Sequence, residues 1–212
     1  MPCHKFLIDG LYRTGSHMLR SAMLQHPQIR TLMLEPLAKI QKPNNARKKI
    51  LELYCQYHGF TLHAQHGIKN NAYQYLPKKL RIIRLNRNPF HRAISELIAN
   101  RRRTWVQYKN DPGAEVKPFY IGDLEFQRTI NTAKRSRQQA KEAIGDRPVL
   151  DIHYEDQQER WNEVFAEVCQ FLDVKVIKVA PTTKKQVVHP EEIVLNYSYL
   201  TEQFRDLLGE ES

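Results

Sequence analysis

The stretch Phe6-Leu-Ile-Asp-Gly-Leu-Tyr-Arg-Thr-Gly-Ser-His-Met-Leu19 decides the fold of this chain. A short apolar run leads into a loop whose glycines, Gly10 and Gly15, are spaced as in a nucleotide-binding P-loop, and a helical pattern of apolar residues follows. Strand, loop and helix together predict a phosphate-binding cradle, because backbone N–H groups converge on the anion and the helix N-terminus adds partial positive charge.

The loop lacks the lysine of an ATP-binding P-loop. The Walker A form ends in Gly-Lys-Ser/Thr, whereas Gly15 is followed here by Ser16 and His17. The cation inside the loop is Arg13. We therefore expect this loop to hold a phosphate group other than the β/γ-phosphates of ATP.

A second segment combines a strand, a turn and a helix. Residues 80–86 form a β-rich run, and Arg87-Asn-Pro89 leads from it into a helix. Asn88 is a favourable N-cap residue, and Pro89 suits the first helical position. Arg87 stands where the strand ends, and Ser95 lies eight residues further on, in the second helical turn.

Together these two segments resemble the PAPS-dependent sulfotransferases, and the resemblance runs from about residue 6 to residue 208. Tyr154-Glu-Asp156, followed by Phe171-Leu-Asp-Val174, is similar to the family's Tyr-Glu-Asp, helix, Phe-Leu-Gly-Val segment, with Asp173 in place of glycine. The resemblance implies an α/β fold of the P-loop-like three-layer type, with a mostly parallel central sheet flanked by helices.

The resemblance also implies how the sulfuryl donor, 3′-phosphoadenosine 5′-phosphosulfate (PAPS), is bound. The family's first loop binds the 5′-phosphosulfate, and the corresponding residues are Arg13, Thr14, Gly15, Ser16 and His17. An arginine and a serine eight residues apart bind the 3′-phosphate, which implies that role for Arg87 and Ser95. Arginine suits it, because its planar guanidinium matches phosphate geometry. Met18 would lie near the adenine, where the family usually has an aromatic or aliphatic residue.

The reaction requires a general base for the acceptor hydroxyl and cations on the transferring group. Cytosolic members of the family carry Lys-Thr-His on the strand before the Arg-Asn-Pro strand, and the corresponding segment is identified as Gly67-Ile-Lys-Asn-Asn71. Lys69 then matches the lysine, and with Arg13 it would supply positive charge. Asn71 stands where the catalytic histidine would be. Because asparagine cannot take a proton, we expect another base.

Glu35 is the first candidate for that base. The run from Ile29 reads as a strand that ends at Glu35, and Pro36 keeps the preceding residue extended. Several carbohydrate and bacterial sulfotransferases have a similar Glu-Pro arrangement, with the glutamate facing the acceptor. His66 is the rival base and His17 a third possibility, while the alternative interpretation of Glu35 is a surface glutamate at a strand exit.

Cysteine and histidine side chains raise the possibility of a zinc site at Cys55, His58, His63 and His66. Cys55 and His58 belong to an expected helix, however, and His63 and His66, three apart on an expected strand, would face opposite sides of the sheet. The family's reaction does not require a metal, and no metal is expected.

Short β-rich runs alternate with amphipathic helical patterns, which predicts a mostly parallel sheet covered by helices. Strands are expected near residues 4–9, 29–34, 61–66, 80–86 and 148–153. Helices are expected near residues 16–26, 46–58, 89–103, 123–144, 156–172 and 190–208. Because ligands of such sheets bind beyond the carboxyl ends of the strands, one crevice is expected to hold both Arg13 and Arg87.

Two segments outside these motifs have a less specific interpretation. The apolar residues of the stretch 104–122 follow neither a helical nor a strand periodicity. Because long loops are usually lids, binding loops or disordered, the stretch is interpreted as a substrate-side loop. The simplest interpretation of Arg101-Arg-Arg103 is that these cations interact favourably with the dipole at a helix C-terminus. Its functional alternative is the capture of an acidic acceptor or cofactor.

The composition is that of a globular protein. With 212 residues and 41% hydrophobic content, one domain spanning residues 1–212 is expected. No apolar run of 18 residues predicts a membrane span, and the N-terminus does not read as a signal peptide. Three scattered cysteines argue against a disulfide framework, so a cytoplasmic location is expected.

The net charge of +10 favours anionic partners. PAPS would account for part of this charge, and nucleic acid is a less favoured partner. The alternative to a sulfotransferase is a non-catalytic P-loop-like protein that binds a polyanion such as RNA or phospholipid. The acceptor of a sulfotransferase would be a hydroxyl or amine on a small molecule, a glycan or a lipid, and the sequence gives no oligomeric state.

Overall fold

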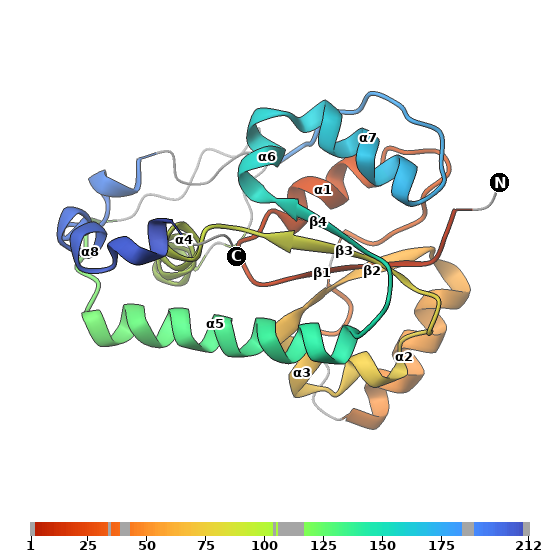
Figure 1. Cartoon of the computed structure of the whole chain (residues 1–212), viewed down its shortest axis with the longest axis horizontal. Coiled ribbons are helices and arrows are strands. Elements are labelled where there is room, and N and C mark those ends of the chain that lie inside the picture. Colours follow the sequence, from red (N-terminus) through yellow and green to blue (C-terminus); the bar gives the residue numbers. More distant parts are fainter. Residues whose placement is uncertain are drawn as a thin grey trace.

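A four-stranded parallel sheet forms the centre of the protein, with strand order β2-β1-β3-β4 (Figure 1). The computed structural model describes residues 3–33, 35–38, 43–103, 105, 117–183 and 189–209. The strands are β1 (Phe6–Gly10), β2 (Gly59–His63), β3 (Arg81–Asn86) and β4 (Val149–His153). The predicted α/β fold with a parallel sheet flanked by helices is confirmed.

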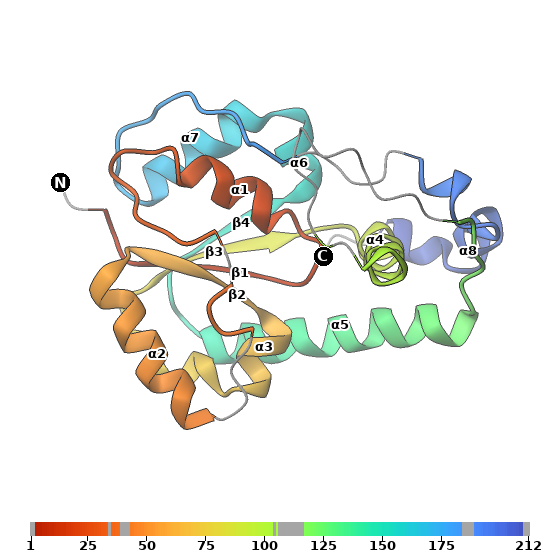
Figure 2. The same cartoon turned by 180° about the vertical axis from the view of Figure 1, so that it is seen from behind.

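Helices cover both faces of the sheet and close one end of it (Figures 1 and 2). One face carries α1 (Ser16–Met23), α6 (Tyr154–Glu159) and α7 (Trp161–Phe171). The other face carries α2 (Pro43–Gln56), α3 (Ala64–Lys69), the 3-10 helix η1 (Ala72–Tyr75) and α5 (Asp123–Ile144). Beyond the carboxyl ends of the strands lie α4 (Pro89–Arg102), η2 (Pro190–Glu192), α8 (Tyr197–Gln203) and η3 (Arg205–Leu208).

The central strand β1 is buried along its whole length. Phe6 and Ile8 pack into the core that α1 and α7 share with the sheet. Leu7 points the other way, into the core formed with α2, α3 and α5. This two-sided burial explains why the strand reads as an apolar run rather than as an alternating pattern.

Asp9 is the polar exception in β1, and its side chain is fully buried. It accepts a hydrogen bond of 2.5 Å from the Tyr73 hydroxyl, and its other carboxylate oxygen lies 3.1 Å from Nη1 of Arg137 in α5. Arg137 also donates to Asn86 Oδ1 over 2.7 Å. One helix thereby fixes the ends of β1 and β3, directly before the two segments predicted to bind phosphate.

The expected strand at residues 29–34 is wrong for the part that the structure describes. Residues 29–33 run beside the start of β2 without forming a ladder. The His58 N–H donates to the Arg30 carbonyl over 2.8 Å, and the Thr31 hydroxyl donates to the Gly59 carbonyl over 3.0 Å. One backbone bond and the side-chain bonds of residues such as Thr31 thus stand in place of the regular backbone pairing that a strand requires.

The expected strand at residues 61–66 is also wrong at its end. β2 stops at His63, and α3 begins at Ala64. Residues 67–71 are therefore the end of a helix and a turn, in which Asn71 has the left-handed φ of 49°. Two predicted helices are broken as well, since residues 156–172 divide into α6 and α7 and residues 190–208 divide into η2, α8 and η3.

Two further observations concern membrane-spanning helices and disulfide bonds. None of the described helices has the length and apolar character needed to cross a lipid bilayer. Cys3, Cys55 and Cys169 are all free thiols.

Candidate active site

The loop between β1 and α1 turns through two residues in the left-handed conformation, Arg13 with φ 69° and Gly15 with φ 87°. The Thr14 hydroxyl donates to a carbonyl of the same loop, and Nη1 of Arg87 donates to the Arg13 carbonyl over 2.9 Å. A Cβ at Gly15 would lie 2.8 Å from the Tyr154 ring. Glycine is therefore required there both by the backbone conformation and by the close approach of a side chain.

Helix α1 begins directly after this loop, at Ser16. Its first turn contains no acidic residue. The buried Arg20 donates from Nε to the Ser16 carbonyl over 3.2 Å. The backbone N–H groups at the start of α1 and the partial positive charge of the helix end therefore face the loop without a carboxylate to neutralise them.

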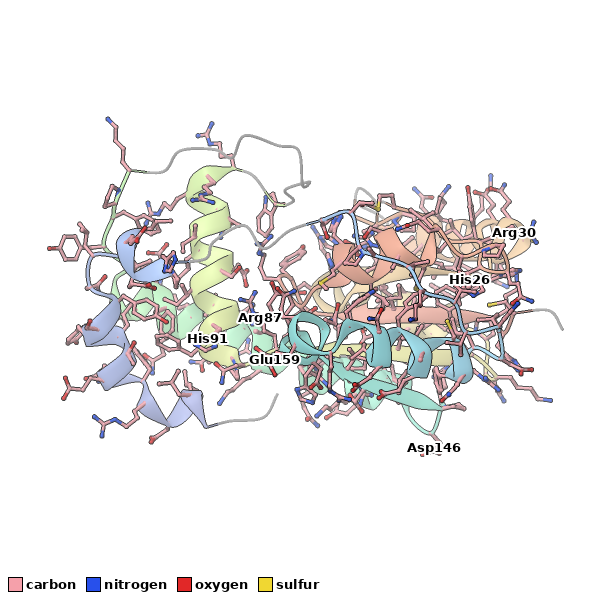
Figure 3. All side chains as sticks on the ribbon, turned by 90° about the horizontal axis from the view of Figure 1, so that it is seen from above. His26, Arg30, Arg87, His91, Asp146 and Glu159 are labelled. Carbon is pink, nitrogen blue, oxygen red and sulfur yellow. The ribbon has the colours of Figure 1, made fainter. Side chains whose placement is uncertain are left out.

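Arg13, Arg87 and Ser95 line a cavity of about 420 Å³. The cavity lies between α4, α6 and the segment that contains η2 and the start of α8, and Figure 3 shows Arg87, His91 and Glu159 at this place. Its volume falls within the range of about 300–1,000 Å³ that is common for small-molecule sites. The structure thus brings the predicted 3′-phosphate residues into one cavity with the loop arginine.

The two arginines of this cavity are largely buried. Burial, and to a smaller extent the nearby Arg87, lowers the pKa of Arg13 to about 10. Burial also lowers the pKa of Arg87, whose guanidinium lies 4.2 Å from the centre of the Tyr154 ring. Arg13 donates from Nε to the Ser95 hydroxyl over 3.0 Å. A bound anion would relieve the repulsion between the two guanidinium groups.

His17 and Met18 continue the first turn of α1. Burial, with smaller contributions from Arg20 and other nearby cations, lowers the pKa of His17 to about 3. Its buried Nδ1 makes no hydrogen bond within the described part of the chain. The Met18 sulfur lies 3.0 Å from the side-chain amide of Gln158, which lines the cavity.

We expect His17→Gln to reduce the loss of stability on acidification. Because the pKa of His17 falls from its ordinary 6.5 to about 3 on folding, the unfolded chain binds a proton between those values that the folded chain does not. Stability should therefore fall between pH 7 and pH 5, and the glutamine variant should lose less. Urea unfolding at both pH values measures the difference, and an identical loss in the two proteins would contradict a buried neutral His17.

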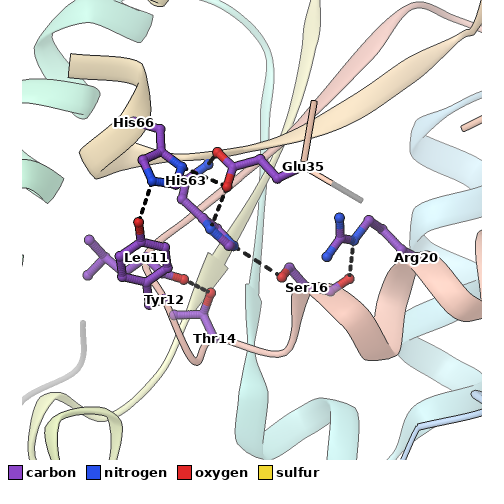
Figure 4. Close-up of polar contacts among 8 residues, drawn as sticks. All are labelled: Leu11, Tyr12, Thr14, Ser16, Arg20, Glu35, His63 and His66. Atoms are coloured by element: carbon purple, nitrogen blue, oxygen red, sulfur yellow. Dashed lines mark hydrogen bonds and ion pairs between the residues drawn. The ribbon is translucent and has the colours of Figure 1, made fainter. Parts of the chain in front are cut away.

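Glu35 lies beside the carboxyl end of β2, with its side chain 7% exposed. Its Oε1 accepts the backbone N–H of His63 over 2.9 Å. Its Oε2 lies 2.8 Å from Nδ1 of His66 and 3.0 Å from Nδ1 of His63 (Figure 4). Burial alone would raise the pKa of Glu35, but its contacts with the two histidines outweigh burial and lower that pKa to about 2.

The outer nitrogens of the two histidines face different partners. Nε2 of His66 lies 2.5 Å from the Tyr12 hydroxyl, whereas Nε2 of His63 lies 3.4 Å from the Ser16 hydroxyl at the start of α1 (Figure 4). The Tyr12 ring packs edge-on against both imidazoles, at 4.8 and 5.4 Å between ring centres. His63 therefore directs its outer nitrogen toward the N-terminus of α1, whereas His66 directs its own toward Tyr12 in the loop before that helix.

The structure does not bring Lys69 into this site. Lys69 is the exposed last residue of α3, and it makes no hydrogen bond or ion pair with any described residue. Its assignment depended on a strand at residues 67–71, whereas the strand before β3 is β2, which ends at His63. His63 is the last residue of that strand, whereas Asn71 lies in the turn after α3. From the sequence, His63 was considered only as a metal ligand, and the alternation of Phe60 and Leu62 with polar neighbours was the signal that could have placed His63 at a strand end.

The four side chains considered as zinc ligands do not come together. Cys55 is exposed on α2, and Nδ1 of His58 accepts the backbone N–H of Arg30 over 3.1 Å. His63 and His66 were expected on opposite faces of a strand. They share Glu35 instead, because the chain turns into a helix between them.

The predicted substrate-side loop lies largely outside the described residues, which include Trp105 and residues 117–122 of it. Trp105 is 42% exposed, and its ring centre lies 5.5 Å from that of Tyr12. Arg101, from the basic run at the end of α4, forms an ion pair of 3.3 Å with Glu125 and lies over the Phe119 ring. These contacts give Arg101 a structural role between α4 and α5.

Comparisons with known proteins bear on the fold and on the family of this chain. A search of curated proteins found no match. Among solved structures, the chain is similar to a sulfotransferase from Alicyclobacillus acidocaldarius, with 16% identity over 99% of this chain and 97% of that chain and a TM-score of 0.51. It is also similar to mouse sulfotransferase SULT7A1 complexed with PAP, with 17% identity over 82% of this chain and 60% of that chain and a TM-score of 0.50.

These structural likenesses concern the fold. The assignment to a family depends on the sequence, since the family model described as the sulfotransferase domain matches residues 4–206, nearly the whole chain. The chain therefore belongs to the sulfotransferase family.

Proposed function

We propose that this protein transfers a sulfuryl group from PAPS to a hydroxyl group of an acceptor. One observation carries the proposal. At the carboxyl ends of the adjacent strands β2, β1 and β3 lie a carboxylate–histidine pair, a phosphate loop, and an arginine that lines one cavity with Ser95. These are the three components that the reaction needs: a proton acceptor, a site for the transferring group and a site for the nucleotide.

The residues of the cavity fit a nucleotide with phosphate at two positions. Arg87 and Ser95 would hold the 3′-phosphate, and residues 13–17 with the start of α1 would hold the 5′-phosphosulfate. The mouse protein was solved with PAP (3′,5′-adenosine bisphosphate), which is the product that remains when PAPS has lost its sulfuryl group. Glu155, Glu159 and Glu191 also line the cavity, so an anionic ligand would place its phosphates on the arginine side. When bound, PAPS supplies the sulfuryl group and a phosphate leaving group.

His63 is the residue that we propose as the general base. A carboxylate beside Nδ1 favours a hydrogen on that nitrogen, which leaves Nε2 free to accept a proton at the phosphate loop. Both oxygens of Glu35 already have partners within 3.0 Å, so Glu35 is proposed to orient His63 rather than to take the proton itself. His66 is less suited than His63, because its Nε2 faces the Tyr12 hydroxyl.

Positive charge on the transferring group would come from the loop. Arg13 is largely buried beside Arg87, and its Nε donates a hydrogen bond to the Ser95 hydroxyl. In the proposed reaction Arg13 and the N-terminus of α1 stabilise the charge that grows on the leaving phosphate. The exposed position of Lys69 gives no support to the role that the sequence suggested for it.

The acceptor side of His63 is bordered by aromatic rings. Tyr12 lies against His63, and the half-exposed Trp105 lies against Tyr12. Such a border suits a small molecule, glycan or lipid that carries its hydroxyl on an apolar face.

The free cysteines are consistent with action in the cytoplasm. The alternative of a non-catalytic polyanion-binding protein rests on the net charge of +10 and on Asn71 at the expected base position, and the role proposed for His63 would remove the second of these reasons.

Calorimetric titration with PAP, with ATP as the control, tests the proposed donor. PAP presents the 3′-phosphate for which Arg87 and Ser95 are suited, whereas ATP places its additional phosphates where this loop lacks the Walker lysine. We expect saturable binding of PAP and affinity at least about tenfold lower for ATP, which corresponds to about 1.4 kcal/mol. Equal or tighter binding of ATP would contradict the proposal.

A further inference from the structure

Glu35, His63 and His66 form a cluster with the composition of a transition-metal site. Each residue offers one ligand atom, and these atoms all lie within 4.8 Å of one another. Glu35 comes from the segment before α2, whereas the histidines lie on either side of the junction between β2 and α3. The cluster is distinct from the Cys55 and His58 combination, which the structure does not assemble.

The two separations from the Glu35 carboxylate suit a shared ion. Zinc lies about 2.0–2.2 Å from histidine nitrogen and carboxylate oxygen, so two neighbouring ligands of one ion are roughly 2.8–3.6 Å apart. Oε2 of Glu35 lies 2.8 and 3.0 Å from the two Nδ1 atoms. The backbone N–H of His63 already occupies Oε1, which leaves Oε2 as the oxygen that faces both imidazoles.

One nitrogen of the cluster is poorly satisfied without a ligand. Nδ1 of His63 is buried and makes no hydrogen bond within the described residues, although Oε2 of Glu35 is only 3.0 Å away. In the tautomer that carries its hydrogen on Nε2, this Nδ1 and Oε2 of Glu35 can both direct lone pairs at a third atom. A buried polar atom without a hydrogen bond is uncommon in folded proteins, and a bound ion would satisfy this nitrogen.

The surroundings complete the arrangement of a metal site. Histidines that bind a metal through one nitrogen normally donate a hydrogen bond from the other. Here the outer nitrogens face oxygen atoms, the Tyr12 hydroxyl at 2.5 Å from His66 and the Ser16 hydroxyl at 3.4 Å from His63. The side chains of His63 and His66 are 12% and 21% exposed, so an ion can reach the cluster from solvent.

We propose that Glu35, His63 and His66 bind one divalent transition-metal ion of the zinc class, and that this ion blocks sulfuryl transfer. The ion would take Nδ1 of His63 as a ligand and leave the hydrogen on Nε2, so that His63 could not accept the proton of an acceptor. The inhibition rests on the proposed function, whereas the metal binding does not. The site would be selective, because imidazole ligands suit zinc and magnesium prefers oxygen ligands.

Equilibrium dialysis of the full chain with Zn²⁺ tests the site without substrate or donor. We expect one ion per chain, no competition from Mg²⁺, and a loss of affinity of at least about tenfold in His66→Ala and in Glu35→Gln. Tyr12→Phe, which keeps all three ligands and removes only the outer partner of His66, should weaken binding by about 10–100-fold. His58→Ala and Cys55→Ser are the matched controls and should bind as the parent does.

The absorption spectrum of the Co²⁺-loaded parent protein gives a second measurement that needs no variant. Nitrogen and oxygen ligands give weak visible bands, whereas a thiolate ligand adds intense near-ultraviolet absorption. No stoichiometric binding, a thiolate spectrum, or loss of binding in Cys55→Ser but not in His66→Ala would overturn the proposed site. Zinc binding by a protein that fails to bind PAP would instead contradict only the proposed function. Bound Zn²⁺ without inhibition would overturn the regulatory part.

Discussion

Replacing His63 by alanine should lower the turnover of sulfuryl transfer by about 10²–10⁴-fold, the range typical of a general base. Affinity for PAP should remain nearly unchanged, because His63 faces the loop from the β2 side and does not line the nucleotide cavity. The measurement is the initial rate with PAPS and an acceptor, which is first found by screening hydroxyl compounds. Calorimetry with PAP on the same variant separates lost chemistry from lost donor binding.

Variants of other candidate residues are compared with His63→Ala in the same assay. Glu35→Gln keeps the size of the side chain and removes its charge, so turnover should fall by less than in His63→Ala. His66→Gln should retain more activity than either. If Glu35→Gln is inactive while His63→Ala retains turnover, the base is Glu35, as its position before Pro36 first suggested. A large loss in Lys69→Ala would restore the sequence-based role of that residue.

Replacing Arg87 by alanine should weaken the binding of PAP by about one to two orders of magnitude while changing the binding of 5′-AMP much less. Only PAP presents the 3′-phosphate, and losing a hydrogen bond to a charged group costs about 1.5–3 kcal/mol. Calorimetric titration of each ligand into parent and variant gives the comparison. Arg128→Ala is the matched control, because it removes one exposed arginine from α5 and lowers the net charge equally.

The outcome for Arg87 distinguishes a specific contact from general electrostatics. Equal weakening of PAP and 5′-AMP would show that Arg87 holds the 5′ side or only the loop, whose Arg13 carbonyl it contacts. Equal weakening of PAP by Arg128→Ala would show that net charge rather than position determines affinity. Either result would remove the 3′-phosphate assignment while leaving the proposed base to its own test.

Much of the local structure around the proposed nucleotide site could be predicted because its signals are local. The spacing of Gly10 and Gly15 requires a tight turn, and Gly15 does adopt a positive φ. Asn88 accepts the backbone N–H of His91 over 3.2 Å, and Pro89 is the first residue of α4, as expected. Each feature depends on a few consecutive residues, so the interactions that fix it can be read from a short stretch of sequence.

The strand predictions at residues 29–34 and 61–66 were wrong for a common reason. A strand requires regular backbone pairing with a neighbour, and a short apolar run does not show whether such a neighbour is present. Residues 29–33 meet the edge of the sheet largely through side chains such as Thr31. The apolar signal after Phe60 likewise did not show that the chain would leave the sheet at His63.

The sequence by itself determined the parallel α/β fold and the turns that lead from β1 into α1 and from β3 into α4, since turn chemistry, helix capping and apolar patterning act over neighbouring residues. The pairing of Arg87 with Ser95 was implied by the resemblance to a family, and the structure places both in one cavity. Only the tertiary structure brought Glu35, His63 and His66 together. Glu35 lies 28 positions from His63 and 31 from His66. Which histidine faces the loop depends on where β2 ends and α3 begins. That boundary is set by packing between distant segments, which no local pattern specifies.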